Sequence, residues 1–195
     1  MATASTQPTY VPSKVLKTDY PLIDNDPHFK RVIGYARPSD YAWGLGMAAG
    51  GPGALLLMEK FAPSHVGRGG FARAMRLAGV IGAIGGFLYF YQQSTFRFYG
   101  MSENAREVEM DMKEMVAKVK AGEPLYGESR LTPHMQGVAA RQSRYSALFM
   151  YGIPWFNFVN HNQHGVDTAK YYREAERQLE AERTGSAQGE AAKLG

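Results

Sequence analysis

Tyr41–Met58 reads YAWGLGMAAGGPGALLLM and Leu77–Phe96 reads LAGVIGAIGGFLYFYQQSTF; both stretches are apolar, glycine-rich and uncharged. A helix that crosses the hydrocarbon core of a bilayer needs about 20 mostly apolar residues, with a range of roughly 17–25. Both stretches fall within that range, and both lie in the first half of the 195-residue chain. The sequence therefore predicts an all-α membrane protein built on a two-span transmembrane helical hairpin, with spans at about 41–58 and 77–96.

Small residues recur at every fourth position in both stretches. This spacing places them along one side of a helix, where they let two helix backbones approach closely in lipid. The predicted helix-packing ridge comprises Ala42, Gly46, Gly50 and Ala54 in the first span and Ala78, Gly82 and Gly86 in the second. The alternative interpretation is that glycine and alanine are simply common in membrane helices.

Four basic residues lie on the connection between the spans: Lys60, Arg68, Arg73 and Arg76. Clustered Lys and Arg at a membrane surface can bind anionic phospholipid headgroups. These residues are therefore candidate lipid-headgroup contacts, and solvated surface charge is an equally good interpretation. Because the connection is short, we expect the two spans to be antiparallel neighbours. Basic residues flank both ends of the hairpin, so the membrane topology of the termini stays open.

Aromatic residues gather at the end of the second span, from Phe87 to Tyr99, and at the start of the first, at Tyr41 and Trp43. Tyr and Trp favour the membrane–water boundary because their rings are apolar and their tips are polar. In a hairpin these two ends lie on the same side. The pattern therefore predicts one membrane boundary at that end.

The remainder of the chain divides into extramembrane segments. We expect residues 1–40 to form an extended N-terminal segment. Within it, Asp26-Pro27 can begin a short helix that ends at Tyr35. The hairpin occupies 41–97, and an extramembrane C-terminal region of helices and loops follows at 98–183. Apolar residues at helical spacing predict a helix at about 102–120, and a charged helix is expected at 167–183, with loop from Gly122 to Gly137 between them. The composition of 184–195 predicts a disordered tail.

A third apolar region, at 145–165, is uncharged but is interrupted by Pro154, and several Asn and His residues make its second half polar. A third span is therefore disfavoured. We expect this region to be extended, and to lie at the membrane interface or on a partner protein.

Composition excludes several classes of site. The chain has no cysteine, so disulfides, thiolate metal sites and cysteine nucleophiles are excluded. Its net charge of +4 is mild, and no nucleic-acid-binding signature is present. The glycines match neither a phosphate-binding loop nor a dinucleotide fingerprint. His161 and His164 are three residues apart and lack a convincing third metal ligand. No catalytic, cofactor-binding or small-molecule site is therefore predicted.

Two motifs carry a family resemblance: DYPLIDNDPH at Asp19–His28 and RPSDYAW at Arg37–Trp43. Through these motifs, residues 14–183 resemble the fungal-type 21-kDa accessory subunit family of mitochondrial NADH:ubiquinone oxidoreductase, respiratory complex I. The glycine-rich hairpin and the YSALFMYGIPWFNFVNHNQHG region fit the same family. The resemblance implies a multi-pass protein of the mitochondrial inner membrane that packs on core subunits of the membrane arm and on phospholipids, with cardiolipin as one candidate. It also implies no flavin, Fe–S cluster, quinone site or catalytic residue in this chain, and a role in assembly and stability.

Two other functions compete with this one. A membrane-shaping or tethering protein could associate with itself through the glycine ridges, without any link to electron transfer. A membrane-bound enzyme could use His161 and His164. The absence of charge within the spans disfavours a proton path in either span.

Overall fold

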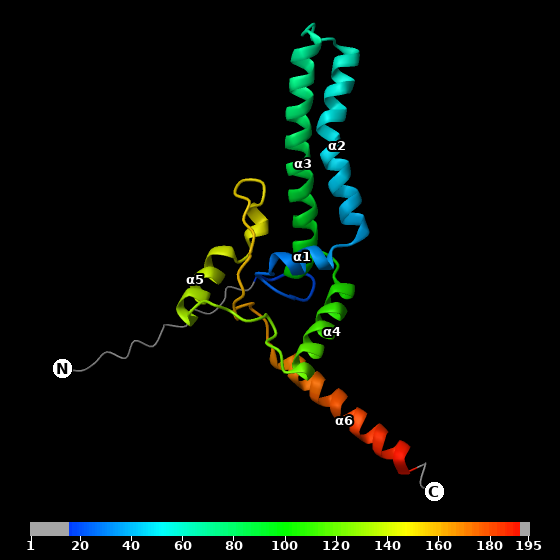
Figure 1. Ribbon diagram of the computed structural model, residues 1–195, viewed down its shortest axis with the longest axis vertical. Coiled ribbons are helices and arrows are strands. Elements are labelled where there is room, and N and C mark those ends of the chain that lie inside the picture. Colours follow the sequence, from blue (N-terminus) through cyan, green and yellow to red (C-terminus); the bar gives the residue numbers. More distant parts are fainter. Residues whose placement is uncertain (1–15, 192–195) are drawn as a thin grey trace, which may run out of the picture.

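The computed structural model describes residues 16–191, with side chains as far as 184, and this part of the chain is helical without a β-strand. Its elements are α1 (Phe29–Tyr35), α2 (Pro38–Phe61), α3 (Arg68–Tyr99), α4 (Ala105–Ala121), α5 (Pro133–Ser143), the 3₁₀ helix η1 (Ser146–Phe149) and α6 (Ala169–Ala191). In Figure 1, α2 and α3 stand away from the other helices; α1, α4 and α5 lie around the lower end of this hairpin, and α6 runs from the far end of α4 away from it. The all-α class is confirmed.

The two hairpin helices are longer than the stretches predicted from the sequence. α2 has 24 residues and α3 has 32, which correspond to about 36 and 48 Å at 1.5 Å per residue. The connection between them is only residues 62–67, which is shorter than the sequence predicted. Lys60 therefore belongs to α2, and Arg68, Arg73 and Arg76 belong to the first turns of α3. Since the hydrocarbon core is about 30 Å thick, α3 is long enough to continue well beyond it.

Within residues 16–191, α3 is the one helix that is both long and apolar enough to cross a membrane. α2 contains Pro52, and it carries Asp40 in its first turn and Glu59 and Lys60 near its end. The hairpin of helices is therefore present, and its second membrane span remains a proposal.

The hairpin helices pack through a ridge that differs in part from the expected one. A Cβ added to Gly86 would collide with the carbonyl oxygen of Gly44, and a Cβ added to Gly82 would collide with that of Ala48. In α2, by contrast, Ala42, Gly46, Gly50 and Ala54 are exposed, and a Cβ at Gly46 or Gly50 would meet nothing within 4 Å. The packing side of α2 is thus Gly44–Ala48–Pro52, which has the same four-residue spacing but a different register.

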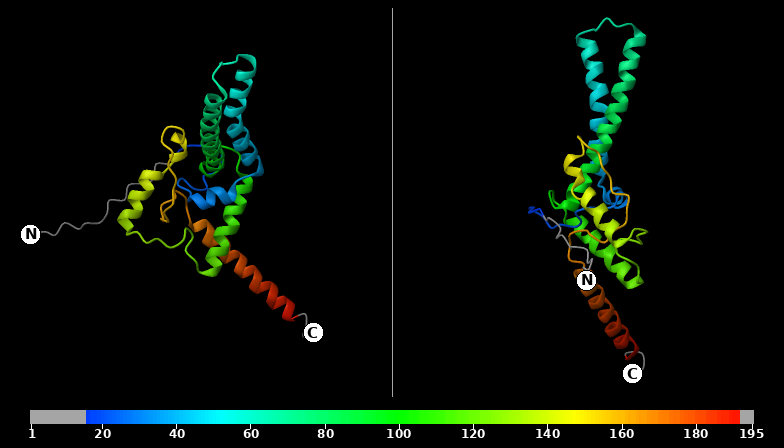
Figure 2. Two further views of the ribbon diagram at one scale, coloured as in Figure 1. Left: turned by 45° about the horizontal axis from the view of Figure 1, so that its top comes forward. Right: turned by 90° about the vertical axis from the view of Figure 1, so that its left-hand side faces the viewer.

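Figure 2 shows α2 and α3 close together near the base and separating toward their connection. The glycine contacts agree, because Gly44 and Gly86 both lie toward the base. Each contact brings backbone against backbone, which only a residue without a Cβ allows. The glycines therefore fix where the two helices cross.

The last turns of α3 form the centre of the largest hydrophobic core in the described residues. Phe90, Tyr91, Phe98 and Tyr99 are buried against Ile23, Val32 and Tyr35 of the N-terminal segment and α1, and against Tyr145, Ala147 and Met150. Four of the aromatic residues expected at a membrane boundary are thus covered by protein, and their position relative to a membrane stays a prediction.

The C-terminal half departs from the sequence prediction in two places and agrees with it in a third. α5 lies partly in a region predicted to be loop, where Thr132 caps it and Pro133 begins it. α6 extends to Ala191, beyond the predicted end at 183, although this part contains Gly185 and Gly189; residues 192–195 lie outside the described residues. Residues 150–165 contain no helix, so the region 145–165 does not form a third span.

Candidate functional site

The most elaborate polar site joins the N-terminal segment to the end of the chain's third apolar region. On the N-terminal side, the backbone N–H groups of Ile23 and Asp24 both donate to the carbonyl oxygen of Phe98, at 3.0 and 3.1 Å. This seats the turn on the last residues of α3. The Oδ1 of Asp24 accepts from the N–H of Asp26 at 2.9 Å, which closes the turn. Asp24, Asn25 and Asp26 are almost completely buried.

The partner segment brings two histidines to this turn. His164 Nδ1 lies 2.7 Å from Asp24 Oδ1, and His161 Nε2 lies 2.8 Å from Asp26 Oδ2. The two imidazole rings are stacked, with centroids 4.4 Å apart, and the ring of Tyr126 stacks on the other face of His164 at 3.6 Å. We call these four residues, Asp24, Asp26, His161 and His164, the Asp–His junction.

Backbone hydrogen bonds hold the same two segments together. Asn25 N–H donates to the carbonyl oxygen of His164 at 3.1 Å, and Phe29 N–H donates to that of Asn157 at 2.7 Å. The Asn157 side chain donates to the carbonyl oxygen of Asp26 at 3.0 Å. Ser143, at the end of α5, donates to Asp26 Oδ2 at 2.5 Å. The junction therefore also ties α5 to the N-terminal turn.

The environment sets the protonation of the Asp24–His164 pair. Burial would raise the pKa of Asp24, but the facing His164 and Arg31 outweigh it and lower that pKa. Burial would lower the pKa of His164, but Asp24 outweighs it and raises that pKa. His164 Nε2 faces the carbonyl oxygen of His161 at 2.7 Å, which can only accept. Both ring nitrogens of His164 are therefore donors, as in an imidazolium.

Asp26 behaves differently from Asp24. Burial raises its pKa despite the hydrogen bonds from His161 and Ser143. His161 Nδ1 accepts from the N–H of Gln163 at 3.2 Å, and this assigns the ring proton to Nε2, which donates to Asp26.

The junction offers no ring nitrogen for chemistry. A general base or metal ligand needs a free imidazole nitrogen, and all four nitrogens of His161 and His164 already have a protein partner. No group of three or more His, Cys, Asp or Glu side chains in the described part of the chain could hold a metal ion. Ser143 donates to a carboxylate, so it is not arranged as a nucleophile beside a histidine base. The geometry is that of a structural clasp.

A second network adjoins the junction and joins three helices. Arg31 of α1 pairs with Asp24, with Asp111 of α4 at 2.6 Å and with Glu114 of α4 at 3.3 Å. Asp111 also accepts from the hydroxyl of Tyr171 in α6 at 2.5 Å. Arg31 therefore links the N-terminal turn to α4, and Asp111 links α4 to α6.

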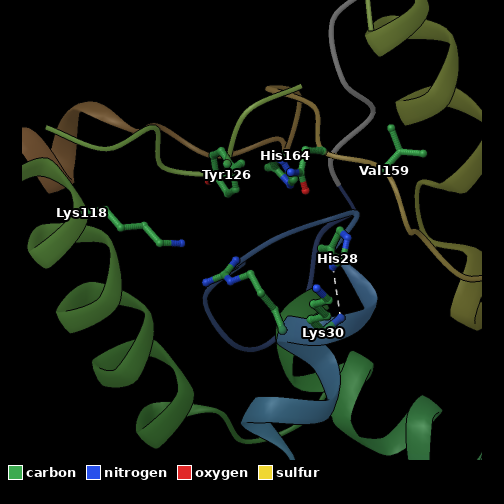
Figure 3. Close-up of a pocket in the computed structure, with 9 residues that line it drawn as sticks. His28, Lys30, Lys118, Tyr126, Val159 and His164 are labelled. Atoms are coloured by element: carbon green, nitrogen blue, oxygen red, sulfur yellow. Dashed lines mark hydrogen bonds between the residues drawn. The ribbon is translucent and has the colours of Figure 1, made fainter. Parts of the chain in front are cut away.

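A cavity of about 260 Å³ opens beside these residues. Figure 3 shows Tyr126 and His164 next to each other, Lys118 reaching in from α4, and His28 and Lys30 at the start of α1. The lining is rich in cations, but Glu114 pairs with both Lys118 and Arg31. Most of the positive charge around the cavity is therefore balanced within the chain.

A third network lies where the hairpin meets the base. Arg97, near the end of α3, pairs with Asp40 of α2, and its Nε lies 3.6 Å from Glu107 of α4. Glu107 also accepts from Arg37 at 2.5 Å. The side chains of Asp40, Arg97 and Glu107 are at most 8% exposed. This network fixes the directions of α2, α3 and α4 relative to one another.

The residues predicted to contact lipid are all exposed: Lys60, Arg68, Arg73 and Arg76. They lie at the end of the hairpin farthest from the base (Figure 1). The structure neither brings them together with the Asp–His junction nor uses them in the core.

The sequence interpretation missed the role of Asp24 and Asp26, which it left unassigned as loop residues. It treated His161 and His164 as a weak metal pair or as hydrogen-bonding groups. One signal was present, because polar Asn and His residues inside an uncharged apolar region need buried partners. The partner could not be identified, since 140 residues separate Asp24 from His164.

Comparison with known proteins covers nearly the whole chain. The family model described as NADH-ubiquinone oxidoreductase complex I, 21 kDa subunit matches residues 17–103. The family model described as C-terminal of NADH-ubiquinone oxidoreductase 21 kDa subunit matches residues 112–193. The NADH-ubiquinone oxidoreductase 20.9 kDa subunit of Neurospora crassa is 72% identical over 182 residues, which cover 93% of this chain and 96% of that relative. The Asp–His junction joins residues from the two matched regions.

Proposed function

Because the chain belongs to the family of the 21 kDa subunit of NADH-ubiquinone oxidoreductase, complex I, we propose that it is a non-catalytic accessory subunit of the membrane arm of mitochondrial respiratory complex I. Its relation to the Neurospora subunit, at 72% identity, is the observation that carries this proposal. The function is to stabilise the assembly by packing the hairpin and the extramembrane segments on core subunits and phospholipids of the inner membrane.

The hairpin supports a two-span arrangement. α2 and α3 cover each other along their glycine sides, and large apolar side chains remain exposed around them, including Leu45, Leu56 and Leu57 on α2 and Leu77, Ile81 and Ile84 on α3. An exposed apolar surface of this extent is unfavourable in water and favourable in lipid or against apolar protein. At about 36 Å, α2 is long enough to cross a bilayer beside α3.

The outward ridge of α2 gives the hairpin a second packing side. Ala42, Gly46, Gly50 and Ala54 are exposed, and among the described residues nothing lies within 4 Å of a Cβ added to Gly46 or Gly50. Small residues at this spacing let a further helix approach closely in lipid. We assign this ridge to a transmembrane helix of a membrane-arm subunit.

The basic end of the hairpin suits phospholipid headgroups. Lys60, Arg68, Arg73 and Arg76 are exposed and lie at or beside the short connection, just outside the apolar stretches. At that position a cationic side chain can reach a lipid phosphate. Cardiolipin, with two phosphates, is the proposed ligand among inner-membrane lipids.

The base supports a structural role over a catalytic one. The chain's two buried histidines have all their nitrogens bonded within the protein, so neither is available for proton transfer to a substrate. The junction and the arginine networks instead join the N-terminal segment, α4 and α5 to the base of α3, and α6 to α4. A rigid base of this kind can fasten neighbouring subunits together.

Native electrophoresis of mitochondria in mild detergent, with mass spectrometry of the band that contains this chain, tests the proposal. We expect migration at the size of complex I together with its core subunits. The variant Gly50→Leu, which changes the outward ridge, is expected to reduce that association, and Gly51→Leu on the neighbouring side of α2 serves as the matched control. Migration of the wild-type chain as a small homo-oligomer without those subunits would contradict the proposal and favour a self-associating scaffold.

A further inference from the structure

The segment from Phe149 to Phe158 exposes large apolar side chains on an irregular backbone. The exposed residues are Phe149, Tyr151, Ile153, Trp155 and Phe158, and both Phe149 and Ile153 are 72% exposed. No Asp, Glu, Lys or Arg occurs between Arg144 and Asp167. A soluble loop normally carries polar residues at such positions, so we expect this apolar surface to be buried against lipid or another protein.

The segment rises along α3 toward the hairpin. At its start, the side chain of Gln92 donates to the carbonyl oxygen of Ala147 at 2.7 Å. The ring of Phe156 then packs on Phe87 at 6.0 Å. Figures 1 and 2 show this yellow segment standing beside the lower part of α3.

These contacts place the segment beside the part of α3 where the predicted span meets the buried core. Phe87 belongs to the apolar stretch Leu77–Phe96 and is 40% exposed, whereas Phe90, one turn further on, is 6% exposed. Trp43 of α2 is exposed at the same end of the hairpin. The exposed apolar residues of the segment therefore lie next to Phe87, at the end of the hairpin that carries Trp43.

We propose that Phe149–Phe158 is a membrane-interface anchor, in which Phe149, Tyr151, Ile153 and Trp155 enter the headgroup–acyl boundary of the leaflet at the base of the hairpin. The occupant of this apolar surface is thus the phospholipid bilayer. The inference rests on the proposed membrane hairpin and adds a third attachment to it. The segment Phe149–Phe158 contains no Lys or Arg and does not form a membrane span.

The backbone of the segment restricts how deep it can go. Gly152 and Ile153 both donate to the carbonyl oxygen of Phe149 at 2.9 Å, but much of the loop has no helical hydrogen bonding. Unpaired backbone groups are not tolerated in the hydrocarbon core, whereas headgroups and interfacial water can satisfy them. Trp and Tyr side chains are also most favourable at this boundary.

The anchor is connected directly to the Asp–His junction. Asn157 and His161, which bind the N-terminal turn, follow the exposed aromatic residues within a few positions. Insertion of the loop therefore fixes the extramembrane base against the membrane surface, and does not rely on the hairpin alone.

The absence of cysteine in the chain allows single-site labelling. Ile153→Cys, with Ile84→Cys on α3 and Tyr172→Cys on α6 as references, would be prepared in the full chain, spin-labelled and placed in phospholipid nanodiscs. All three native side chains are exposed. The ratio of collisions with oxygen to collisions with a water-soluble nickel complex reports depth. We expect the ratio at residue 153 to exceed that at 172 severalfold and to lie below that at 84.

Two results would overturn the inference in distinguishable ways. If the label at 84 lies in lipid and the label at 153 is as accessible to nickel as that at 172, the anchor is absent and the hairpin stands. If the label at 84 is also in water, the membrane hairpin itself fails.

A second readout uses the assembled complex and does not require the isolated chain to fold. Ile153 is replaced by the photo-crosslinker p-benzoylphenylalanine, and mass spectrometry identifies the adduct after irradiation. An adduct with the mass of a phospholipid supports the anchor. An adduct with another protein subunit shows that a protein covers this surface and overturns it.

Discussion

His164 Nδ1 lies 2.7 Å from Asp24 Oδ1, although 140 residues separate them in the chain. This pair closes the base of the structure: it joins the N-terminal turn on the end of α3 to the segment that precedes α6. Both groups are buried, so each depends on the other for its charge. The stability of the base should therefore respond to removal of either partner.

Asp24→Asn should lower the free energy of unfolding by about 3–5 kcal/mol, because it leaves a buried imidazolium and part of Arg31 without a counter-charge. Thermal unfolding of the full chain in detergent measures this. Asp167→Asn is the control, since Asp167 pairs with Arg173 at the surface and both side chains are about two-thirds exposed. Its effect should stay within about 1 kcal/mol. Equal losses in the two variants would refute the clasp.

The same pair predicts a pH dependence. The pKa of His164 is raised from its ordinary value of 6.5, so its contribution to stability is complete below about pH 6.5 and is lost as the pH rises through the folded-state pKa. The pKa of Asp24 is lowered from 3.8, so its contribution is present above that value and is lost as the pH falls. The midpoint temperature of thermal unfolding of the wild type should therefore decrease as the pH is raised above 6.5 and through the folded-state pKa of His164. Asp24→Asn should make this decrease smaller. A decline of equal slope in both proteins would be the contrary result.

Gly86→Ala should weaken the hairpin by about 1–3 kcal/mol, as overpacking does. Its new Cβ would collide with the backbone of Gly44 and would lie 2.8 Å from the Cβ of Ala48. Gly85→Ala is the matched control, because nothing lies within 4 Å of a Cβ there, and alanine favours a helix by about 1 kcal/mol. Thermal unfolding and protease resistance of the hairpin compare the two. The packing ridge is wrongly placed if Gly85→Ala is the more damaging.

Arg97→Met should lower the free energy of unfolding by about 3–5 kcal/mol, because the buried carboxylates of Asp40 and Glu107 would lose this cation as a counter-charge. Combining it with Asp40→Asn should restore part of the loss, so a double-mutant cycle should give a coupling of about 1–3 kcal/mol. Chemical unfolding of the four proteins measures it. Simple additivity would show that Arg97 and Asp40 act independently.

Tyr171→Phe should lower stability by about 1–3 kcal/mol, since it removes a buried hydrogen bond of 2.5 Å to Asp111 and leaves that carboxylate less satisfied. Tyr172→Phe, at the next position but 54% exposed, should change stability by less than about 0.5 kcal/mol. Protection of α6 against hydrogen exchange should fall in the first variant alone. Unchanged protection there would mean that α6 is held mainly by its apolar contacts.

Replacement of Arg68, Arg73 and Arg76 by Gln should reduce the amount of phospholipid that remains bound after purification. Each of the three substitutions removes a headgroup contact worth about 1 kcal/mol. Replacement of the same three by Lys keeps the charge and should retain most of the lipid. The phosphate content of the purified protein measures both. Equal lipid retention in the Gln and Lys variants would assign these residues to solvated surface charge.

Local patterns determined much of this structure. The apolar stretches specify α2 and α3, the spacing of Val108, Met112 and Met115 specifies α4, and Pro154 prevents a third long helix. These features depend on hydrophobic periodicity and on the missing donor of proline, which act within a few residues. The glycine spacing also predicted Gly82 and Gly86, which lie against α2, although it selected the wrong register on α2.

Tertiary structure alone decided the rest. Glycines occur on more than one side of α2, so the sequence could not show which side faces α3; contact of Gly44 with Gly86 settles it. The aromatic end of α3 matches a membrane boundary by composition, yet it is buried because the N-terminal segment and α1 fold over it. The pairing of Asp24 with His164 depends on contacts between residues far apart in sequence, which periodicity within one segment cannot encode.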